Sequence, residues 1–215
     1  MNLYLIRHGK TLLNEYGKMQ GWADSPLTEQ GREVAAETGK KLADISFDRV
    51  YTSDLSRTVE TAEILLHENN HKENLVIRKT KEFRELFFGS LEGDSTENVW
   101  KEMAKVSGLS NGEEVLRTMS MKEITELFHK IDPLHHAETF EEFSKRRERG
   151  LEIILSEKEK EEENILIVSH GVVIRHIIDT FSEEEVGLIN VENCSVTHLE
   201  YCDGAYKLVG YNLFS

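Results

Sequence analysis

Three short apolar runs in this chain each end in residues that could do chemistry together. They end in Arg7-His8-Gly9, in Ser53-Asp54 with Arg57 one helical turn further on, and in Ser169-His170-Gly171. A cationic side chain at the end of a buried strand is costly unless it meets a partner of opposite charge. Arginine suits a phosphate, because its planar fork donates to two oxygens at once and keeps its charge. These residues predict a phosphate-sized cation cluster, provided that the fold brings the three ends together.

The elements around these residues alternate between strand and helix. Apolar runs predict strands at 3–6, 49–52, 75–77 and 165–168, and a terminal hairpin of strands at 195–199 and 206–211. Helical spacing predicts helices over about 28–42, 53–66 and 172–181, and one from 139 to the charged run 157–163. The expected N-caps are Thr28, either Ser53 or Asp54, and Thr139 with Glu142 in a capping box.

This alternation predicts an α/β fold, a three-layer α/β/α sandwich with a mainly parallel central sheet and one antiparallel edge strand. The carboxyl ends of parallel strands lie on one edge of such a sheet, where ligands bind. The middle of the chain is less regular, with short helices expected near 98–106 and 121–129. We interpret 86–138 as a helical cap-like insertion over the active site, within a single domain spanning 1–215.

Several large side chains outside the strand ends have structural interpretations. Trp22 and Phe88 are candidates for a substrate wall, whereas core packing is favoured for Trp100 and Phe87. The long helix carries Arg146 and Arg147, which we expect at the surface or in salt bridges.

The composition restricts the partners and the location of the protein. Lysine and arginine number 26 against 40 acidic residues, a net charge of −14, which disfavours nucleic acid and anionic lipid as partners. Any bound anion must then be held by a local group of cations. Cys194 and Cys202 lack the spacing of a metal site, so we expect reduced thiols in a cytoplasmic protein and no metal. No apolar stretch approaches the length of a membrane span.

Five motifs in a fixed order resemble those of the histidine phosphatase superfamily, also called phosphoglycerate mutase-like. They are Arg7-His8-Gly9, the segment 21–28 (GWADSPLT), the segment 52–58 (TSDLSRT) with Ala62, Glu85 with Gly89 and the segment 91–93 (LEG), and Ser169-His170-Gly171. The resemblance covers nearly the whole chain. One departure is Lys10, where many members carry a non-basic residue, and it could add a cation near the site.

The resemblance implies a role for each site residue. His8 would be the nucleophile that forms a phosphohistidine, while Arg7, Arg57 and His170 would hold the phosphoryl oxygens. Asn14 would be a supporting donor. Neighbouring arginines keep an imidazole neutral, as a nucleophile requires.

Two further residues complete the expected site. Glu85 would be the general acid for the leaving oxygen and then the base for water; Glu82 and Glu92 are nearby carboxylates, and only the family spacing selects Glu85. Gly171 leaves the backbone room to approach the ligand.

These roles favour a metal-independent phosphatase that acts on a small phosphorylated metabolite without a cofactor. One alternative is a cofactor-dependent phosphoglycerate mutase, which would use 2,3-bisphosphoglycerate. Another is a non-catalytic module that binds a phosphorylated ligand or regulates a partner. The substrate and the oligomeric state stay open at this stage.

Overall fold

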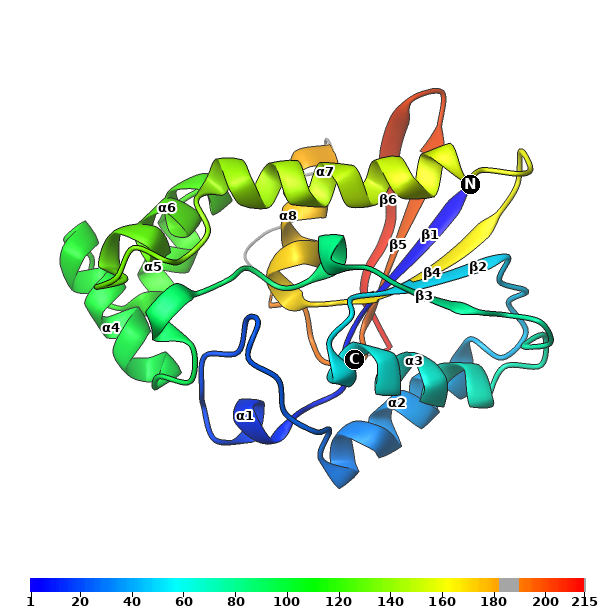
Figure 1. The fold of residues 1–215 in the computed structure, drawn as a ribbon, viewed down its shortest axis with the longest axis horizontal. Helices are drawn as coiled ribbons and strands as arrows, with labels where there is room; N and C mark the ends of the chain where they lie inside the picture. Colours follow the sequence, from blue (N-terminus) through cyan, green and yellow to red (C-terminus); the bar gives the residue numbers. More distant parts are fainter. Residues whose placement is uncertain (182–189, 215) are drawn as a thin grey trace.

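The computed structural model describes residues 1–181 and 190–214 and places a six-stranded sheet at the centre of the molecule (Figure 1). The strand order is β3-β2-β4-β1-β5-β6. The strands are β1 (Asn2–Arg7), β2 (Arg49–Thr52), β3 (Ile77–Lys79), β4 (Asn164–Ser169), β5 (Val196–Cys202) and β6 (Ala205–Leu213).

The predicted α/β fold with a mainly parallel sheet is confirmed. Strands β1 to β4 pair in parallel, whereas β5 is antiparallel both to β1 and to β6. The antiparallel strand therefore lies one place in from the edge, and β6 of the terminal hairpin forms the edge itself. Strand β3 begins two positions later than the expected 75–77, because Leu75 belongs to a turn in which its N–H donates to Lys72.

Alternation along the buried strands divides the core between the two faces of the sheet. Ile6, Val50, Leu166 and Val168 pack with Leu42, directly after α2 (Glu29–Lys41), and with side chains of α3 (Ser56–His67). The intervening side chains of β1 and β4 pack instead with α7 (Phe140–Ser156) and α8 (Gly171–Phe181). Figure 1 shows these helix pairs on opposite sides of the sheet, which gives the three layers.

The middle of the chain forms a group of short helices at one end of the molecule, beyond α7 (Figure 1). They are α4 (Thr96–Ser107), α5 (Gly112–Thr118) and α6 (Met121–Ile131), preceded by the 3₁₀ turns η1 (Lys81–Phe83) and η2 (Gly89–Leu91). Helices α4 and α6 match the two expected segments, but α5 and the one-turn α1 (Leu12–Glu15) had not been expected. The apolar side chains of α4, α5 and α6 continue the core on the α7–α8 face.

The helix caps follow the sequence with one exception. Thr28 accepts from the Gly31 N–H, and Thr139 and Glu142 form the expected capping box. The expectation of Ser53 or Asp54 as the cap of α3 is wrong, because α3 begins after Leu55, which makes no side-chain cap.

Tertiary contacts explain why the cap of α3 differs. Ser53 bonds to Thr58 and His170 inside the fold, and Asp54 forms an ion pair with Arg84. The Ser56 N–H at the start of α3 donates to Asp24, a residue distant in sequence.

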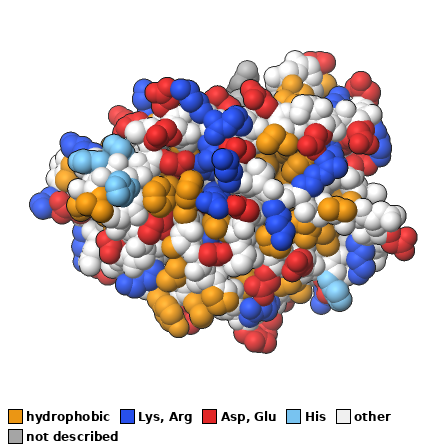
Figure 2. All heavy atoms as spheres, viewed as in Figure 1, with side chains coloured by type: hydrophobic (Ala, Val, Ile, Leu, Met, Phe, Trp, Pro, Cys, Tyr) orange, Lys and Arg blue, Asp and Glu red, His pale blue; other side chains and the backbone are white. Residues whose placement is uncertain are grey.

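Acidic and basic side chains are interspersed with apolar ones over the face shown in Figure 2. None of the helices that the structure describes is long and apolar enough to cross a membrane. The cytoplasmic location and the absence of a nucleic-acid partner stay predictions.

Helix α2 lies directly against the first strand end, and this contact requires glycine. A Cβ at Gly31 would lie 2.3 Å from the carbonyl oxygen of Lys10, and one at Gly9 would lie 2.8 Å from the carbonyl oxygen of Gly31. Gly9 at the strand end therefore makes room for the backbone of this helix.

Replacing Gly31 with alanine should therefore destabilise the protein by about 1–3 kcal/mol, the usual cost of overpacking. Thermal and denaturant unfolding measure this effect. The matched control is Glu33→Ala, an exposed position on the same helix. Equal stability of the two variants would contradict the tight backbone contact.

Candidate active site

The parallel strands bring their carboxyl ends to one edge of the sheet, as the sequence predicted. Arg7 at the end of β1 is in register with Ser169 of β4, and Thr52 of β2 is in register with Val168. Strand β3 ends at the same edge, since Thr52 also pairs with Lys79. The segment that follows β3 carries Glu85, so a fourth strand end contributes to the site.

His8 is buried and held in one tautomer. Its Nδ1 lies 2.8 Å from the carbonyl oxygen of Gly9. A carbonyl oxygen only accepts, so Nδ1 carries the proton and Nε2 keeps its lone pair. Burial, followed by the charges of Arg57 and Arg7, lowers the pKa of His8 well below its ordinary value. The ring is therefore neutral at physiological pH, as a nucleophile must be.

His170 lies next to His8, with ring centroids 5.2 Å apart. Its Nδ1 accepts from Nη2 of Arg57 at 3.0 Å, and its Nε2 donates to the hydroxyl of Ser53 at 2.9 Å. Burial and the charge of Arg57 lower the pKa of His170 well below the ordinary range. Since both ring nitrogens bind protein groups, a contact with phosphate requires one of these bonds to exchange.

The two arginines are positioned by backbone carbonyls, and each keeps a buried Nε donor for a ligand. Arg7 donates from Nη1 to Val191. Arg57 donates to Gly21, to Ala23 and to the carboxylate of Asp24. Among the described residues, no hydrogen-bond partner reaches the buried Nε of Arg7 or of Arg57. A buried cationic N–H without an acceptor is costly, so an anion that accepts from both atoms fits this place.

Glu85 is buried at the N-terminus of α8. One carboxylate oxygen accepts from the Leu86 N–H at 3.0 Å and the other from the Val172 N–H at 3.1 Å. Burial raises the pKa of Glu85, although these N–H groups and the charges of Arg57 and Arg7 oppose the rise. The raised pKa keeps a proton on the carboxyl group to higher pH, as a general acid requires.

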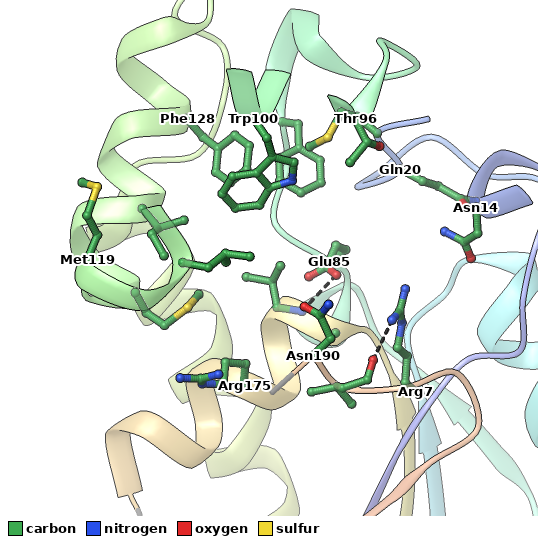
Figure 3. Close-up of a pocket in the computed structure, with 18 of the residues that line it drawn as sticks. Arg7, Asn14, Gln20, Glu85, Thr96, Trp100, Met119, Phe128, Arg175 and Asn190 are labelled. Carbon is green, nitrogen blue, oxygen red and sulfur yellow. Dashed lines mark hydrogen bonds between the residues drawn. The ribbon is translucent and has the colours of Figure 1, made fainter. Parts of the chain in front are cut away.

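A cavity of about 330 Å³ opens onto these residues (Figure 3). Arg7, Asn14, Glu85 and Gly171 line it, while His8, Arg57 and His170 are buried behind this wall. His8 and His170 are chain neighbours of Arg7 and Gly171, and Arg57 hydrogen-bonds His170. The structure thus brings together the seven residues to which the resemblance or the sequence gave a site role: Arg7, His8, Asn14, Arg57, Glu85, His170 and Gly171.

Two of the lining residues have particular geometry. The Oδ1 atom of Asn14 accepts from the Thr11 N–H, so its amide nitrogen is the atom that can donate to a ligand. A Cβ at Gly171 would lie 3.6 Å from Nε of Arg7 and would occupy the space beside that unpaired donor. Gly171 therefore leaves room where an anion would bind.

This arrangement agrees with comparisons to known proteins. The family model of the histidine phosphatase superfamily (branch 1) matches residues 3–213. The chain belongs to the histidine phosphatase superfamily.

Proteins named phosphoglycerate mutase and proteins named phosphatase both resemble this chain. The probable phosphoglycerate mutase GpmB of Erwinia tasmaniensis is 29% identical, over 98% of this chain and 90% of that protein. The uncharacterized phosphatase PhoE of Bacillus subtilis is 28% identical, over 98% and 94%. The crystal structure of phosphoglycerate mutase from Bacillus anthracis str. Sterne matches with a TM-score of 0.93 at 38% identity, over 100% of this chain and 93% of that one. These names support enzyme activity.

A carboxylate to which the sequence assigned no role organises the loop around Arg57. Glu92 accepts from the N–H groups of Gly21, Trp22 and Ala23 at 2.9, 2.9 and 3.0 Å. Two of these residues present their carbonyls to Arg57. Glu92 belongs to the same superfamily motif as Glu85, but its partners lie about 70 positions earlier in the chain.

The segment that carries Glu85 is held by an arginine that the sequence placed at the surface or in a salt bridge. Arg146 is buried on α7 and does form an ion pair, with Glu138 at 2.8 Å. Its guanidinium also donates to the carbonyls of Lys81, Glu82, Arg84 and Glu85. Arg146 therefore fixes the backbone on which the carboxyl group of Glu85 stands.

Lys10 does not line the cavity. It lies 3.6 Å from Glu15 and near Gln30, whereas Lys18 is the lysine among the described lining residues.

In the part of the chain that the structure describes, no group of three or more His, Cys, Asp or Glu side chains is arranged to hold a metal ion.

Proposed function

We propose that this protein is a phosphatase that hydrolyses small phosphomonoesters through a phosphohistidine at His8. The observation that carries the proposal is the pair of unpaired Nε donors, on Arg7 and Arg57, beside a neutral His8 whose Nε2 keeps its lone pair. A phosphoryl group would satisfy both donors while it presents its phosphorus to His8. Phosphoryl transfer depends mainly on such positioning and charge stabilisation.

In the first step Nε2 of His8 attacks phosphorus, and the bond from phosphorus to the ester oxygen breaks. Glu85 gives its proton to that oxygen, so the product leaves as a neutral alcohol. In the second step water attacks the phosphorus, the bond from phosphorus to Nε2 of His8 breaks, and Glu85, now a carboxylate, takes a proton from the water. Inorganic phosphate leaves, and His8 and Glu85 return to their starting states.

The phosphoglycerate mutase alternative requires a site for 2,3-bisphosphoglycerate, and the small number of cations in the described cavity lining supports hydrolysis instead. The molecule carries a second phosphate and a carboxylate beyond the phosphate next to His8. Besides Arg7, the described lining residues with positive charge are Lys18 and Arg175, and Arg175 forms an ion pair with Asp179 at 2.9 Å. So few cations do not offset the charge of that ligand, and we propose hydrolysis without a cofactor.

The second alternative, a non-catalytic module that binds a phosphorylated ligand, would need only the arginines. Here the site also contains a neutral His8 and a buried Glu85 whose pKa is raised. A binding module gains nothing from a carboxyl group buried close to the charge of its anionic ligand. The catalytic proposal accounts for both groups.

Incubation with 3-phosphoglycerate, with and without 2,3-bisphosphoglycerate, tests the choice between hydrolysis and mutase activity. We expect release of inorganic phosphate that does not depend on the bisphosphate. Formation of 2-phosphoglycerate that requires the bisphosphate, without net phosphate release, would overturn the proposal. A broad panel of phosphomonoesters that yields neither phosphate nor labelled enzyme would favour the binding module.

The pH dependence of kcat/KM should reflect the two shifted groups. The reactive form has a neutral His8 and a protonated Glu85. Since the pKa of His8 is lowered well below 6.5, the enzyme should lose activity only at acidic pH, where His8 becomes protonated. Since the pKa of Glu85 is raised above 4.5, activity persists beyond that value and falls as pH rises through the raised pKa. Profiles of wild type and Glu85→Gln, compared on one substrate, isolate the basic limb; a limb that remains in the variant would contradict the assignment.

Replacing Arg146 with lysine should lower kcat by about 10- to 100-fold, because a small displacement of a catalytic group has a large effect on rate. Lysine keeps the charge but loses the planar fork that reaches several carbonyls. The effect should be larger for esters of poor leaving groups, which need the proton of Glu85. Arg149→Lys, on the same helix and half-exposed, is the matched control. A uniform loss on all esters would indicate a merely structural role.

A further inference from the structure

The cavity has an apolar wall opposite its phosphate-binding end. Helices α4, α5 and α6 supply this wall, and Figure 3 shows Trp100 and Phe128 across the cavity from Arg7. The apolar lining residues of this wall are Trp100, Leu116, Met121, Ile124 and Phe128 from the helices, and Met119 directly after α5. A ligand that reaches the phosphate end would therefore place the remainder of its structure against carbon.

The side chains at the front of this wall are not fully covered by the protein. Trp100, Leu116, Met119 and Met121 are half-buried, whereas Ile124 and Phe128 behind them are buried. The expectation that Trp100 packs in the core is therefore only partly right, because its ring also faces the cavity. Phe128 holds that ring in an edge-to-face contact, with centroids 5.6 Å apart. Apolar surface left open in a cavity indicates a ligand that covers it.

Charged groups around the cavity are few and partly paired. Glu85 and Arg7 belong to the reaction end, and Arg175 is paired with Asp179. The polar side chains opposite the apolar wall are also engaged in part: Gln20 accepts from Thr11 and donates to Ser25. Lys18 is the remaining charged side chain among the described lining residues. Other polar lining residues are Asn14, Thr96, Ser120 and Asn190. Against the apolar wall itself, a polyol or a carboxylate-bearing alcohol would still lose water without equivalent partners.

The geometry points to phosphomonoesters of apolar, ring-bearing alcohols as the favoured substrates, with the ring against Trp100 and the phosphate at Arg7 and His8. This inference rests on the proposed phosphatase function and adds the chemical class of the leaving group. It disfavours phosphates of sugars, glycerol and hydroxy acids.

The test compares esters of primary alcohols whose intrinsic reactivities are similar: glycerol 1-phosphate, benzyl phosphate and 2-naphthylmethyl phosphate. We expect kcat/KM to rise along this series, by about 100-fold between the first and the last, as buried apolar surface increases. Benzylphosphonate, which cannot be hydrolysed, should be a stronger competitive inhibitor than methylphosphonate, by a factor comparable to the gain in kcat/KM from the ring. This second measurement separates binding from the chemical step.

Variants of the apolar wall test whether these side chains cause the substrate preference. In Trp100→Ala, the ratio of kcat/KM for 2-naphthylmethyl phosphate to that for glycerol 1-phosphate should fall about tenfold. Met119→Ser, at the residue directly after α5, should shift the ratio in the same direction. The conservative Trp100→Phe should retain most of the preference, and Val106→Ala, exposed on α4 outside the cavity lining, should retain all of it.

The outcomes distinguish a failure of the apolar substrate class from a failure of the proposed phosphatase function. Preference for glycerol 1-phosphate, or an unchanged ratio in both Trp100→Ala and Met119→Ser, would overturn the apolar substrate class. Acid-labile phosphate on His8 would then still support the phosphatase. Absence of both turnover and labelling with every ester would overturn the proposed function, and this inference with it.

Discussion

His8→Ala should abolish turnover and leave no acid-labile phosphate on the protein. Loss of a nucleophile in a comparable covalent mechanism lowers kcat by a factor of about 10⁶, and we expect at least about 10⁴ here. No other described side chain can replace His8: the ring nitrogens of His170 are both engaged, with Arg57 and Ser53. Rapid-quench labelling with a ³²P-labelled phosphomonoester measures the trapped phosphate, and release of inorganic phosphate measures turnover.

The control for this experiment is His67→Ala, an exposed histidine at the end of α3. It should trap as much phosphate as wild type. Thermal unfolding should show that the His8 variant is folded, since the side chain makes a single hydrogen bond, with the adjacent Gly9 carbonyl. Equal trapping by wild type and the His8 variant would refute the covalent mechanism.

The convergence of the site could be predicted from the sequence because it depends on topology. Alternating strands and helices dictate a parallel sheet, and a parallel sheet gathers its carboxyl ends at one edge. Arg7 and Ser169 are thereby in register although they are far apart in the chain. Glu85 was harder to place, because three carboxylates lie close together and only the family motif distinguished them.

The predictions that were wrong or incomplete concern long-range contacts, which no local sequence pattern indicates. The start of α3 is capped from Asp24, so Ser53 is free to bond His170. Likewise the periodicity of α7 shows that Arg146 lies on a helix, but not that backbone carbonyls converge on it. Trp100 illustrates the same limit for aromatic residues: its type and spacing do not show whether the ring is covered by protein or by a ligand.

Glu85→Gln should separate the two halves of the proposed reaction. Glutamine has the same shape and can still accept from the Val172 N–H, so the start of α8 should be retained. It cannot transfer a proton, and loss of a general acid typically lowers the rate by about 10²- to 10⁴-fold. Benzyl phosphate, whose leaving oxygen must be protonated, should therefore be turned over more slowly by about this factor.

An ester with an acidic leaving group gives the opposite result in the first step. Because p-nitrophenolate leaves without a proton, p-nitrophenyl phosphate should still phosphorylate His8 in Glu85→Gln. The variant also lacks the base for water, so the phosphoenzyme should accumulate and nitrophenol should appear as a burst that matches the enzyme concentration. Glu82→Gln, a nearby carboxylate that pairs with Arg149, is the matched control and should show no burst. Benzyl phosphate turnover at the wild-type rate in Glu85→Gln would assign the proton transfer to another group.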